Sequence, residues 1–417
     1  MWRYRLLLLV LSLPLITITI WHAIRYRDLQ LVLQRLGLSI PCTSTKPVWI
    51  HAASVGEINA VIPFIKLLKE KHPQQALLIS TNTPTGKQVL KKHFPDIEHT
   101  YLSFDWALIS TRFVHNIKPV CALVFETEIW PNLFSAIAKQ HIPLIIFNGR
   151  VSGKSLKARQ RFADAYQYAL QHVTTIFARS NQDRDNFITL GAAAQKVETV
   201  GNIKYAAVNS GEITPVDLSR PYILAASTRD GEEKYLLDAL KDSPSESLLG
   251  EILLVIAPRH PQRRAEIETD LAGFKLPVAV RSRNEAVTAS TAIYLADTLG
   301  ELNNFIAGAE FVMMGGAFLP FGGHNILEVG QLGKAVIFGS HMNNFASEAE
   351  TFLENNAALQ VTNKNELREA VQQLISQPDK AQRLGKNGET LMARNADMAE
   401  TYLNKISSYC PALQKTD

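Results

Sequence analysis

The chain has 417 residues, of which 46% are hydrophobic and 20% are charged. This composition excludes a disordered or fibrous protein, and the length exceeds what one ordinary core accommodates, so two domains of roughly 200 residues are expected. The three cysteines, Cys42, Cys121 and Cys410, are scattered along the chain. They predict neither a disulfide framework nor a cysteine metal site, and a reducing compartment is expected.

The net charge of +4 conceals an uneven distribution. Residues 1–206 contain 24 Lys and Arg against 12 Asp and Glu, whereas the remainder contains 19 against 27. A basic first half is expected to attract an anionic membrane surface or a phosphorylated acceptor. Nucleic acid is the other partner that such charge suits, but neither stacking aromatics nor an arginine-rich recognition helix supports it. No nucleic-acid partner is therefore expected.

The first predicted element is an apolar stretch from Leu6 to Ile24, with arginines on both sides. No small-x-small cleavage site follows it, so residues 1–27 are interpreted as an uncleaved membrane anchor. About 19 residues are just enough to span a bilayer, although Pro14 and the short length also fit an interfacial helix. Because arginines flank both ends, charge alone leaves the orientation open.

Residues 28–208 alternate between short β-branched segments and amphipathic helical segments. The expected strands are Val48–Ala52, Ala76–Thr81, Val120–Phe125, Pro143–Phe147 and Thr174–Ala178. The expected helices are Ile58–Lys71, Pro84–His93, Trp130–Gln140 and Leu156–His172. Strands separated by helices of this length predict a parallel sheet that is covered on both faces, as in a Rossmann-like domain.

A polar stretch at residues 209–221 is the expected linker, after which the alternation restarts over residues 222–404. The strands expected there are Tyr222–Ala226, Ile252–Ala257, Pro277–Arg281, Ala292–Leu295, Phe311–Met314 and Ala335–Phe338, and helices are expected to begin at Gly231, Gly300, Asn325 and Phe345. The predicted fold class is α/β with two doubly wound domains whose carboxyl edges face one another. The helical stretch from Asn365 to about Leu403 is a candidate to cross back over the first domain.

Glu57 is the most informative residue of the first half. It follows the first predicted strand, at the sheet edge where open α/β folds bind ligands. Gly56 is expected to adopt a backbone conformation closed to other residues, and the helix N-terminus is expected to favour the ionised acid, which suits a general base. The competing interpretation is a helix-start Glu that only complements the helix dipole.

Two further acids and a lysine follow predicted strands in the same half. Glu126 and Glu128 come after an apolar strand, and their alternation predicts that one faces the cleft while the other is structural. Lys204 lies just before the linker, where it either neutralises the charge of a leaving group or substrate carboxylate or is an ordinary hinge lysine.

The second half has three turns at predicted strand ends. Arg259 is suited to pair with a phosphate or to stack on a nucleobase. That it is an ordinary arginine of a surface loop is an equally good interpretation. Gly300 opens a predicted helix, whose backbone N–H groups suit an anion. In Gly-Gly-x-Asn-x-x-Glu, Asn325 is expected to cap the next helix, and Glu328 suits a ribose diol or is a plain capping acid.

Metal-binding patterns are weak in this sequence. Asp183-Arg184-Asp185 has the Asp-x-Asp spacing of metal-dependent sugar transferases, but it lies at a predicted helix start, where acids are expected anyway. Neither a His-x-x-x-His pair nor a cysteine-rich spacing occurs. The expectation is an enzyme with no metal and no cofactor.

Six motifs taken together resemble a known family, the 3-deoxy-D-manno-octulosonic acid (Kdo) transferases of lipid A assembly. They occur in this order over nearly the whole chain: His-Ala-Ala-Ser-Val-Gly-Glu (51–57), Glu-Thr-Glu-Ile-Trp-Pro-Asn (126–132), Gly-Asn-Ile-Lys (201–204), Pro-Arg-His-Pro (258–261), Asp-Thr-Leu-Gly-Glu-Leu (297–302) and Gly-Gly-His-Asn-Ile-Leu-Glu (322–328). This sequence has Ile326 where the family often has Pro, and Tyr205 where Phe is usual, and neither change removes a charged group.

The resemblance implies a GT-B architecture, with an acceptor-binding first domain and a CMP-sugar-binding second domain. It implies that Glu57 is the general base and that Glu126 and Lys204 stabilise the transition state. The residues that it implies for CMP are Pro258, Arg259, Leu299, Gly300, Glu301, Asn325, Ile326, Leu327 and Glu328.

The implied reaction is metal-independent, inverting transfer of Kdo from CMP-Kdo to a glucosamine hydroxyl of a phosphorylated lipid A precursor (lipid IVA), with release of CMP. It belongs to lipopolysaccharide inner-core synthesis, on the cytoplasmic side of the bacterial inner membrane. Two alternatives stay open. One is a GT-B transferase that uses a UDP-sugar, and the other is a non-catalytic nucleotide-binding protein of the membrane surface.

Overall fold

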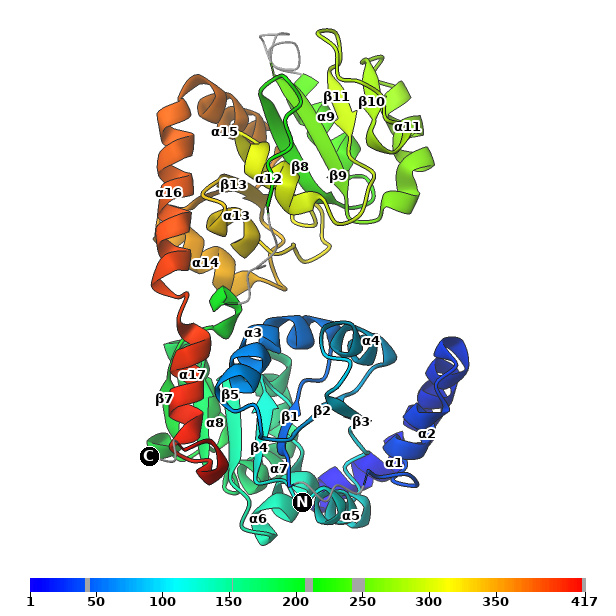
Figure 1. The fold of residues 1–417 in the computed structure, drawn as a ribbon, viewed down its shortest axis with the longest axis vertical. Helices are drawn as coiled ribbons and strands as arrows, with labels where there is room; N and C mark the ends of the chain where they lie inside the picture. Colours follow the sequence, from blue (N-terminus) through cyan, green and yellow to red (C-terminus); the bar gives the residue numbers. More distant parts are fainter. Residues whose placement is uncertain (42–45, 152, 207–212, 242–251, 415–417) are drawn as a thin grey trace. The chain divides into compact units, whose positions relative to one another are not determined.

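The computed structural model describes residues 1–41, 46–151, 153–206, 213–241 and 252–414. Two compact units are present: Met1–Ala207 together with Asp397–Asp417 form unit 1, and Val208–Ala396 form unit 2 (Figure 1). Each unit contains one seven-stranded sheet whose strands pair in parallel. The predicted α/β class with two Rossmann-like domains is confirmed. Cys42 and positions 209–212 of the expected linker lie outside the described residues.

The sheet of unit 1 has the order β3-β2-β1-β4-β5-β6-β7. Its strands are β1 (Val48–His51), β2 (Leu77–Thr81), β3 (Glu98–Tyr101), β4 (Cys121–Phe125), β5 (Leu144–Gly149), β6 (Thr175–Ala178) and β7 (Val197–Thr199). The helices between them are α3 (Val55–Lys71), α4 (Pro84–His93), α5 (Ala107–Ile117), α6 (Pro131–Lys139), α7 (Gly153–Leu170) and α8 (Asn181–Leu190). The strand order reverses between β1 and β4, which is where such sheets bind ligands.

The two edge strands of unit 1, β3 and β7, were not predicted. Their sequences, Glu-His-Thr-Tyr and Val-Glu-Thr, are short and partly polar, because an edge strand leaves part of its surface in water. The central strands β1, β2, β4 and β5 are buried at every position, which explains why their continuous apolar segments were recognisable.

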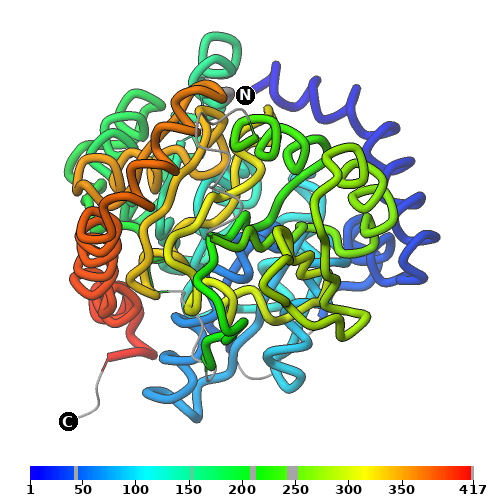
Figure 2. The backbone as a smooth tube through the Cα atoms, turned by 90° about the horizontal axis from the view of Figure 1, so that it is seen from above, coloured from blue at the N-terminus to red at the C-terminus, as the bar shows by residue number. Residues whose placement is uncertain are grey.

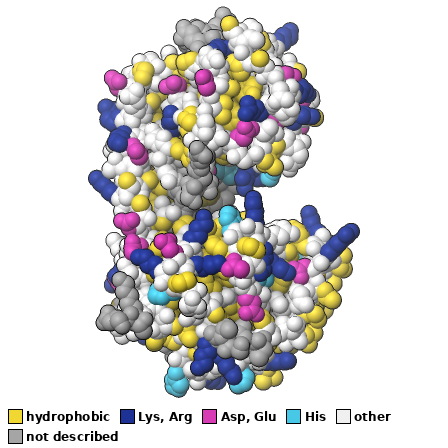
Figure 3. Space-filling view, in the orientation of Figure 1, with side chains coloured by type: hydrophobic (Ala, Val, Ile, Leu, Met, Phe, Trp, Pro, Cys, Tyr) yellow, Lys and Arg dark blue, Asp and Glu magenta, His cyan; other side chains and the backbone are white. Residues whose placement is uncertain are grey.

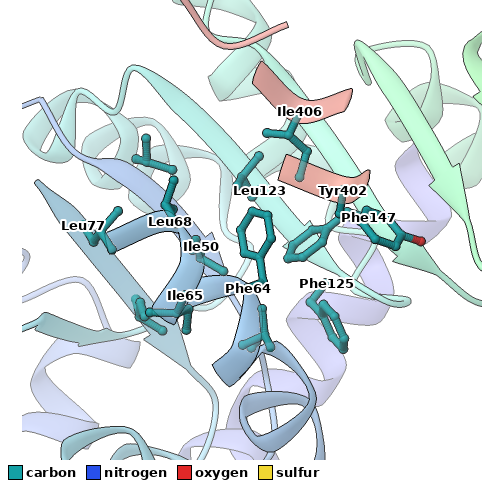
Figure 4. Packing of buried hydrophobic residues seen from close by; sticks show 14 of the residues in the cluster. Ile50, Phe64, Ile65, Leu68, Leu77, Leu123, Phe125, Phe147, Tyr402 and Ile406 are labelled. Atoms are coloured by element: carbon teal, nitrogen blue, oxygen red, sulfur yellow. The ribbon is translucent and has the colours of Figure 1, made fainter. Parts of the chain in front are cut away.

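The last helix, α17 (Met398–Ser407), completes the core of unit 1. Tyr402 and Ile406 are fully buried among Phe64 of α3 and the strands, as Figure 4 shows. The Tyr402 hydroxyl donates a hydrogen bond to the carbonyl oxygen of Gly201 at 2.7 Å. The chain therefore crosses back, and residues 397–404, which the sequence grouped with the second domain, belong by contact to unit 1.

Two of the scattered cysteines meet in this core. Cys121 of β4 and Cys410, just after α17, are both buried there as free thiols. Their mutual hydrogen bond, together with burial, raises the pKa of Cys121. Spacing along the chain did not reveal this proximity, because it depends on α17 returning to unit 1.

The sheet of unit 2 has the order β10-β11-β9-β8-β12-β13-β14. Its strands are β8 (Tyr222–Thr228), β9 (Leu253–Pro258), β10 (Val278–Val280), β11 (Ile293–Leu295), β12 (Phe311–Met314), β13 (Ala335–Gly339) and β14 (Ala358–Val361), of which β14 was not predicted. The helices are α9 (Glu232–Lys241), α11 (Arg264–Ala272), α12 (Leu302–Gly308), α13 (Leu327–Gln331), α14 (Ala346–Glu354), α15 (Lys364–Ser376) and α16 (Pro378–Arg394). Here the strand order reverses between β8 and β12.

Helix α1 (Trp2–Tyr26) lies lengthwise against the rest of unit 1. Within the helix, Thr19 and Ala23 are buried, and eight further positions are half-buried: Tyr4, Leu7, Leu8, Ser12, Leu15, Ile16, His22 and Tyr26. These positions recur with helical spacing, so they lie on one side of the helix. Near its start the Tyr4 hydroxyl donates to Asp105 at 2.7 Å, and near its end Ala23 packs with Leu31 of α2 (Leu29–Arg35) and Tyr101. Figure 2 shows α1 as the dark-blue helix at the rim.

Candidate active site

Glu57 is part of helix α3 and not of the turn before it. The helix begins at Val55 because Ser54 caps it: the Ser54 Oγ accepts from the Glu57 N–H at 3.3 Å and donates to Glu57 Oε1 at 3.0 Å. The Ala53 N–H donates to Oε2 at 2.8 Å. The predicted start at Ile58 was therefore wrong, since the capping box extends the helix by one turn.

The expectation for Gly56 was also wrong. Gly56 is helical and is absent from the residues with positive φ, and a Cβ there would meet only Ser54 Oγ at 3.9 Å. The backbone at this turn is ordinary helix, so a glycine is not required for its conformation.

The carboxyl group of Glu57 holds its proton far more tightly than predicted. Burial first, and then the negative charge of Glu126, raise its pKa to about 8, with a smaller contribution from Glu128. The hydrogen bonds from Ala53 and Ser54 act in the opposite direction but do not compensate. The expectation that this acid is ionised is therefore not met near neutral pH in the free protein, because burial and the charge of Glu126 outweigh the hydrogen bonds from Ala53 and Ser54.

Glu126 and Lys204 form an ion pair beside Glu57. Glu126 follows β4 with φ of 58°, it is 8% exposed, and Oε1 lies 3.0 Å from Lys204 Nζ. Lys204 is carried by η2 (Ile203–Ala206), whose first N–H donates to Asn148 Oδ1 at 3.0 Å. The structure thus directs this lysine toward the acid at the end of β4.

Glu128 is held by a different set of contacts. It accepts hydrogen bonds from Asn82 Nδ2 at 3.1 Å and Trp130 Nε1 at 2.9 Å, and His51 Nε2 lies 3.6 Å away. Burial acts to raise its pKa, but the contacts with His51, Trp130 and Asn82 outweigh burial and lower it. Glu126 has a left-handed backbone conformation, and the charges of both acids act to raise the pKa of Glu57.

In unit 2, Arg259 follows the buried Pro258 at the end of β9 and is exposed. Arg229, at the end of the neighbouring β8, places Nη1 3.3 Å from His260 Nε2. Burial, and then the charges of Arg259, Arg229 and His260, lower the pKa of His324 to about 4. Four basic side chains therefore gather at the carboxyl ends of β8, β9 and the loop after β12.

Three members of this basic cluster, Arg229, His260 and His324, were not selected from the sequence. His260 and His324 lie inside the motifs quoted above, and Arg229 follows β8 as Arg259 follows β9. The sequence places Arg229 and His260 just after predicted strands, which is the sign that could have identified them. The sequence does not show that β8 and β9 are neighbours, since they become adjacent only in the folded sheet.

The segment from Asn325 to Glu328 begins helix α13, which starts at Leu327 and not at Asn325. Asn325 Oδ1 accepts from the Leu327 N–H at 3.2 Å, and its Nδ2 donates to Glu328 Oε1 at 3.0 Å. Burial raises the pKa of Glu328, while Asn325 and Arg259 act to lower it. Ile326 and Leu327 are buried, so they position this segment through packing.

The turn at Leu299–Glu301 differs from the prediction. Leu299 is 82% exposed, Gly300 has φ of 89°, and helix α12 begins only at Leu302. The Glu301 carboxylate pairs with Arg281 Nη2 at 2.7 Å and accepts a hydrogen bond from the Thr298 hydroxyl. Its oxygens are thus engaged within unit 2, whereas the backbone of Gly300 is open.

Glu232 is a further residue that the sequence did not reveal. Its fully buried carboxylate accepts from the N–H groups of Gly316, Phe318, Leu319 and Arg229 at 2.6, 3.0, 3.3 and 2.9 Å. It joins the loop after β12 to the start of α9, at the point where the strand order reverses. The only local sign was an acid in the first turn of a helix.

Both carboxylate oxygens of Asp183 already accept hydrogen bonds within the protein. Its Oδ2 accepts from Ser180 Oγ at 2.8 Å and from Arg179 Nε at 2.9 Å, and its Oδ1 accepts from the Val151 N–H at 2.9 Å. The Ser180 hydroxyl also accepts from the Asp183 N–H, so this acid is part of a helix cap, as the sequence indicated.

Known proteins resemble the chain in sequence over nearly its full length. Residues 30–207 match the family model described as 3-Deoxy-D-manno-octulosonic-acid transferase (kdotransferase). The 3-deoxy-D-manno-octulosonic acid transferase of Haemophilus influenzae is 31% identical, over 98% of this chain and 99% of that protein. The enzyme of the same name from Bordetella pertussis is 28% identical, over 95% and 96%.

Solved structures support the fold. A UDP-GlcNAc 2-epimerase of Neisseria meningitidis, bound to UDP-GlcNAc, has a TM-score of 0.58 at 13% identity, over 87% of this chain and all of that one. The S. aureus MnaA structure with UDP has a TM-score of 0.59 at 14% identity, over 89% and 99%. At this identity the likeness concerns the GT-B-like architecture alone. From the sequence matches it follows that the chain belongs to the 3-deoxy-D-manno-octulosonic acid transferase family.

Proposed function

We propose that the protein transfers Kdo from CMP-Kdo to a glucosamine hydroxyl of a lipid A precursor such as lipid IVA, releasing CMP in the synthesis of the lipopolysaccharide inner core. The carrying observation is the group formed by Glu57, Glu126, Glu128 and Lys204 beyond the carboxyl ends of the neighbouring strands β1 and β4, where the strand order reverses. Family membership supports the sugar, and the basic cluster of unit 2 supports a donor that carries a phosphate.

Glu57 acts as the general base in this proposal. As the new bond forms between the acceptor oxygen and the anomeric carbon, the hydroxyl proton passes to the Glu57 carboxylate, a contribution of roughly 10²–10⁴ in rate. The bond between that carbon and the CMP phosphate breaks, and the phosphate leaves with the electron pair. Attack opposite the leaving group inverts the anomeric centre. With a pKa of about 8 this carboxylate is a stronger base than an ordinary Glu, and the fraction that is ionised and able to take up the proton grows as pH rises toward that value.

Lys204 and Glu126 are proposed to stabilise the transition state. The Lys204 ammonium group is held 3.0 Å from Glu126, so it is already positioned before the substrate binds. It offers positive charge to the sugar carboxylate or the leaving phosphate. Charge from Lys204 and from Arg259 is proposed to replace a metal ion. Engagement of the Asp183 oxygens in a helix cap supports this view.

Unit 2 is proposed to hold CMP at the carboxyl ends of β8, β9, β11 and β12. Arg259, with Arg229, His260 and His324 nearby, suits the phosphate, because guanidinium groups bind phosphate through two N–H donors. Glu328, steadied by Asn325, suits the ribose diol. The backbone at Gly300, where an added Cβ would meet nothing within 4 Å, suits close approach of the nucleotide.

The protein is proposed to work at the cytoplasmic side of the bacterial inner membrane, with α1 in the interface. Among the described residues α1 is long and apolar enough to cross a membrane, with a mean hydropathy of 2.2. It contacts the rest of unit 1 through Tyr4 near its start and Ala23 near its end, and a helix that crosses a bilayer would lose these contacts. An interfacial helix keeps these contacts and buries the opposite apolar face in lipid.

The test uses purified protein, CMP-Kdo and a tetra-acylated acceptor, with the product identified by mass spectrometry. Wild type is expected to add Kdo, and Glu57→Gln is expected to lose transfer while it still binds CMP and folds, because the Ser54 Oγ still accepts from the backbone N–H of residue 57. An active Glu57→Gln protein contradicts the general base. Stabilisation by UMP but not by CMP in thermal unfolding favours the UDP-sugar alternative, and CMP binding without any transfer favours a non-catalytic nucleotide-binding protein.

A further inference from the structure

A pocket of about 340 Å³ opens at the end of α1, within unit 1. One wall is the turn at residues 26–28, which links α1 to α2, and the other is a single face of α4 formed by Pro84, Lys87, Gln88 and Lys91. These four positions follow the spacing of helix turns, so their side chains point to the same side. The pocket is separate from Glu57, Glu126 and Lys204, none of which lines it.

Positive charge predominates in the pocket. Lys87 Nζ pairs with Asp28 Oδ2 at 2.7 Å, and the Tyr101 hydroxyl donates to the same oxygen at 2.7 Å, so the one carboxylate of the lining is already neutralised. Lys91 Nζ donates to the carbonyl oxygens of Pro95 and Ile97 at 3.1 and 2.6 Å.

Arg27 leaves its charge uncompensated. It is exposed, and it forms no ion pair with a residue that the structure describes. Lys91 also keeps its charge, since carbonyl oxygens are dipoles and not anions. The pocket therefore offers net positive charge with donors from two elements, which is the complement of a phosphate group.

The surroundings of the pocket match the membrane interface. On α1, just before Arg27, Ile24 is 73% exposed and Trp21 is 53% exposed, and Arg25 lies over the Trp21 ring at 5.2 Å. Aromatic rings and arginines at the end of an apolar helix are typical of the headgroup level. Figure 3 shows hydrophobic side chains gathered along the edge of unit 1 that α1 and α2 occupy. The pocket thus adjoins a helix end whose residues suit the headgroup level.

We propose that this pocket binds the phosphate of an anionic phospholipid headgroup while the exposed face of α1 is buried in the acyl region. The proposal rests on the proposed membrane location of the enzyme. Binding at one defined point fixes the rotation and depth of α1, and with it the orientation of the β1–β4 edge above the bilayer. General attraction between a basic surface and a membrane provides no such orientation.

The experiment measures binding of the full chain to vesicles of phosphatidylcholine alone and to vesicles with equal amounts of phosphatidylcholine and phosphatidylglycerol. Gln88→Glu places a carboxylate in the pocket without removing a hydrogen bond that the described residues make. Gln195→Glu is the matched control, because Gln195 is exposed on η1 (Ala194–Lys196), next to β7 at the opposite sheet edge from β3. Both variants change the net charge equally.

Gln88→Glu is expected to weaken binding to the anionic vesicles roughly fivefold relative to Gln195→Glu, with little difference on neutral vesicles. Equal weakening by both variants means that only net charge matters, and no weakening means that the pocket is unused. Either result overturns the proposal. It is also overturned if inorganic phosphate stabilises wild type but not Gln88→Glu in thermal unfolding while vesicle binding of the two is the same, because the ligand is then a soluble anion.

Sugar transfer to a detergent-dispersed acceptor separates this proposal from the proposed function. Gln88→Glu is expected to transfer Kdo at the wild-type rate in detergent, since the pocket contains none of the proposed catalytic residues. If Gln88→Glu transfers Kdo in detergent and both variants bind vesicles equally, only the headgroup site is rejected, and the transferase proposal stands. The expected vesicle binding without any transfer rejects the transferase proposal and leaves the headgroup site standing.

Discussion

The Lys204 ammonium and the Glu126 carboxylate lie 3.0 Å apart beside Glu57, at the point where the strand order of unit 1 reverses. After burial, the charge of this same Glu126 is the largest influence that raises the pKa of Glu57. One carboxylate therefore holds the lysine in place and keeps the proposed base protonated until conditions favour release of its proton. The predictions that follow depend on this coupling and on the contacts of unit 2.

Activity is expected to rise with pH. The ionised form of Glu57 is the base, and burial with Glu126 raises its pKa to about 8, so kcat/KM should increase as pH rises through that value. Glu57→Gln should lower kcat by roughly 10²–10⁴ and remove the ascending limb from the residual activity. A pH–rate series with CMP-Kdo checks this, and a wild-type profile that is flat across the region contradicts it.

Glu126→Gln should move the ascending limb to lower pH. It removes the strongest like charge next to Glu57 and leaves the positive charge of Lys204 nearby, and both changes favour the ionised base. The displacement should be on the order of one pH unit, superimposed on a lower maximal rate. Glu98→Gln, on edge strand β3, is the control and should leave the limb in place. If the ascending limb of Glu126→Gln stays at the wild-type pH, the limb does not arise from ionisation of Glu57.

The stability of wild type relative to Glu57→Gln should fall as pH rises. The folded-state pKa is raised from 4.5 to about 8, so the protonated acid is the form that folding favours. Its contribution is fully present below 4.5 and is lost as pH rises through about 8, with a difference on the order of a few kcal/mol. Urea unfolding of both proteins across this range measures it. A difference in unfolding free energy that is independent of pH excludes a raised pKa.

Arg259→Gln should weaken CMP binding more than Arg281→Gln. Arg259 is exposed and its charge acts on Glu328 and His324, whereas Arg281 is committed to Glu301 at 2.7 Å. Loss of a charge-assisted hydrogen bond to phosphate costs about 1.5–3 kcal/mol, or roughly tenfold or more in Kd. Calorimetric titration with CMP compares the variants, and equal losses remove the special role of Arg259.

Tyr402→Ala should destabilise unit 1 although it lies far from the first domain in sequence. The side chain is fully buried among Phe147 and Phe177, and its loss should cost about 3–5 kcal/mol. Tyr402→Phe keeps the ring and removes the hydroxyl, which forms hydrogen bonds with the backbone of Gly201 and Asn148, and it should cost about 1 kcal/mol. Tyr409, which is 41% exposed, provides a control whose change to Ala should cost less than Tyr402→Ala. Comparable losses at both tyrosines would show that α17 does not complete this core.

The sequence predicted the central strands of both sheets well, because these strands are buried on both faces and therefore consist of continuous apolar segments. It missed β3, β7 and β14, whose partly polar sequences are those of sheet edges. It also placed several helix starts incorrectly, because a capping contact such as Ser54 with Glu57 becomes apparent only when the side chains are positioned.

Local order along the chain was enough to establish the two-domain α/β class, the apolar first helix and the strand ends that carry the charged residues, since hydrophobic periodicity and turn residues act over short distances. The ionisation of Glu57, the meeting of Arg229 with His260 and the four backbone donors of Glu232 were decided by the fold. Each depends on groups that are distant in sequence and adjacent in space. Electrostatic and burial energies follow spatial distance, which the order of residues alone does not contain.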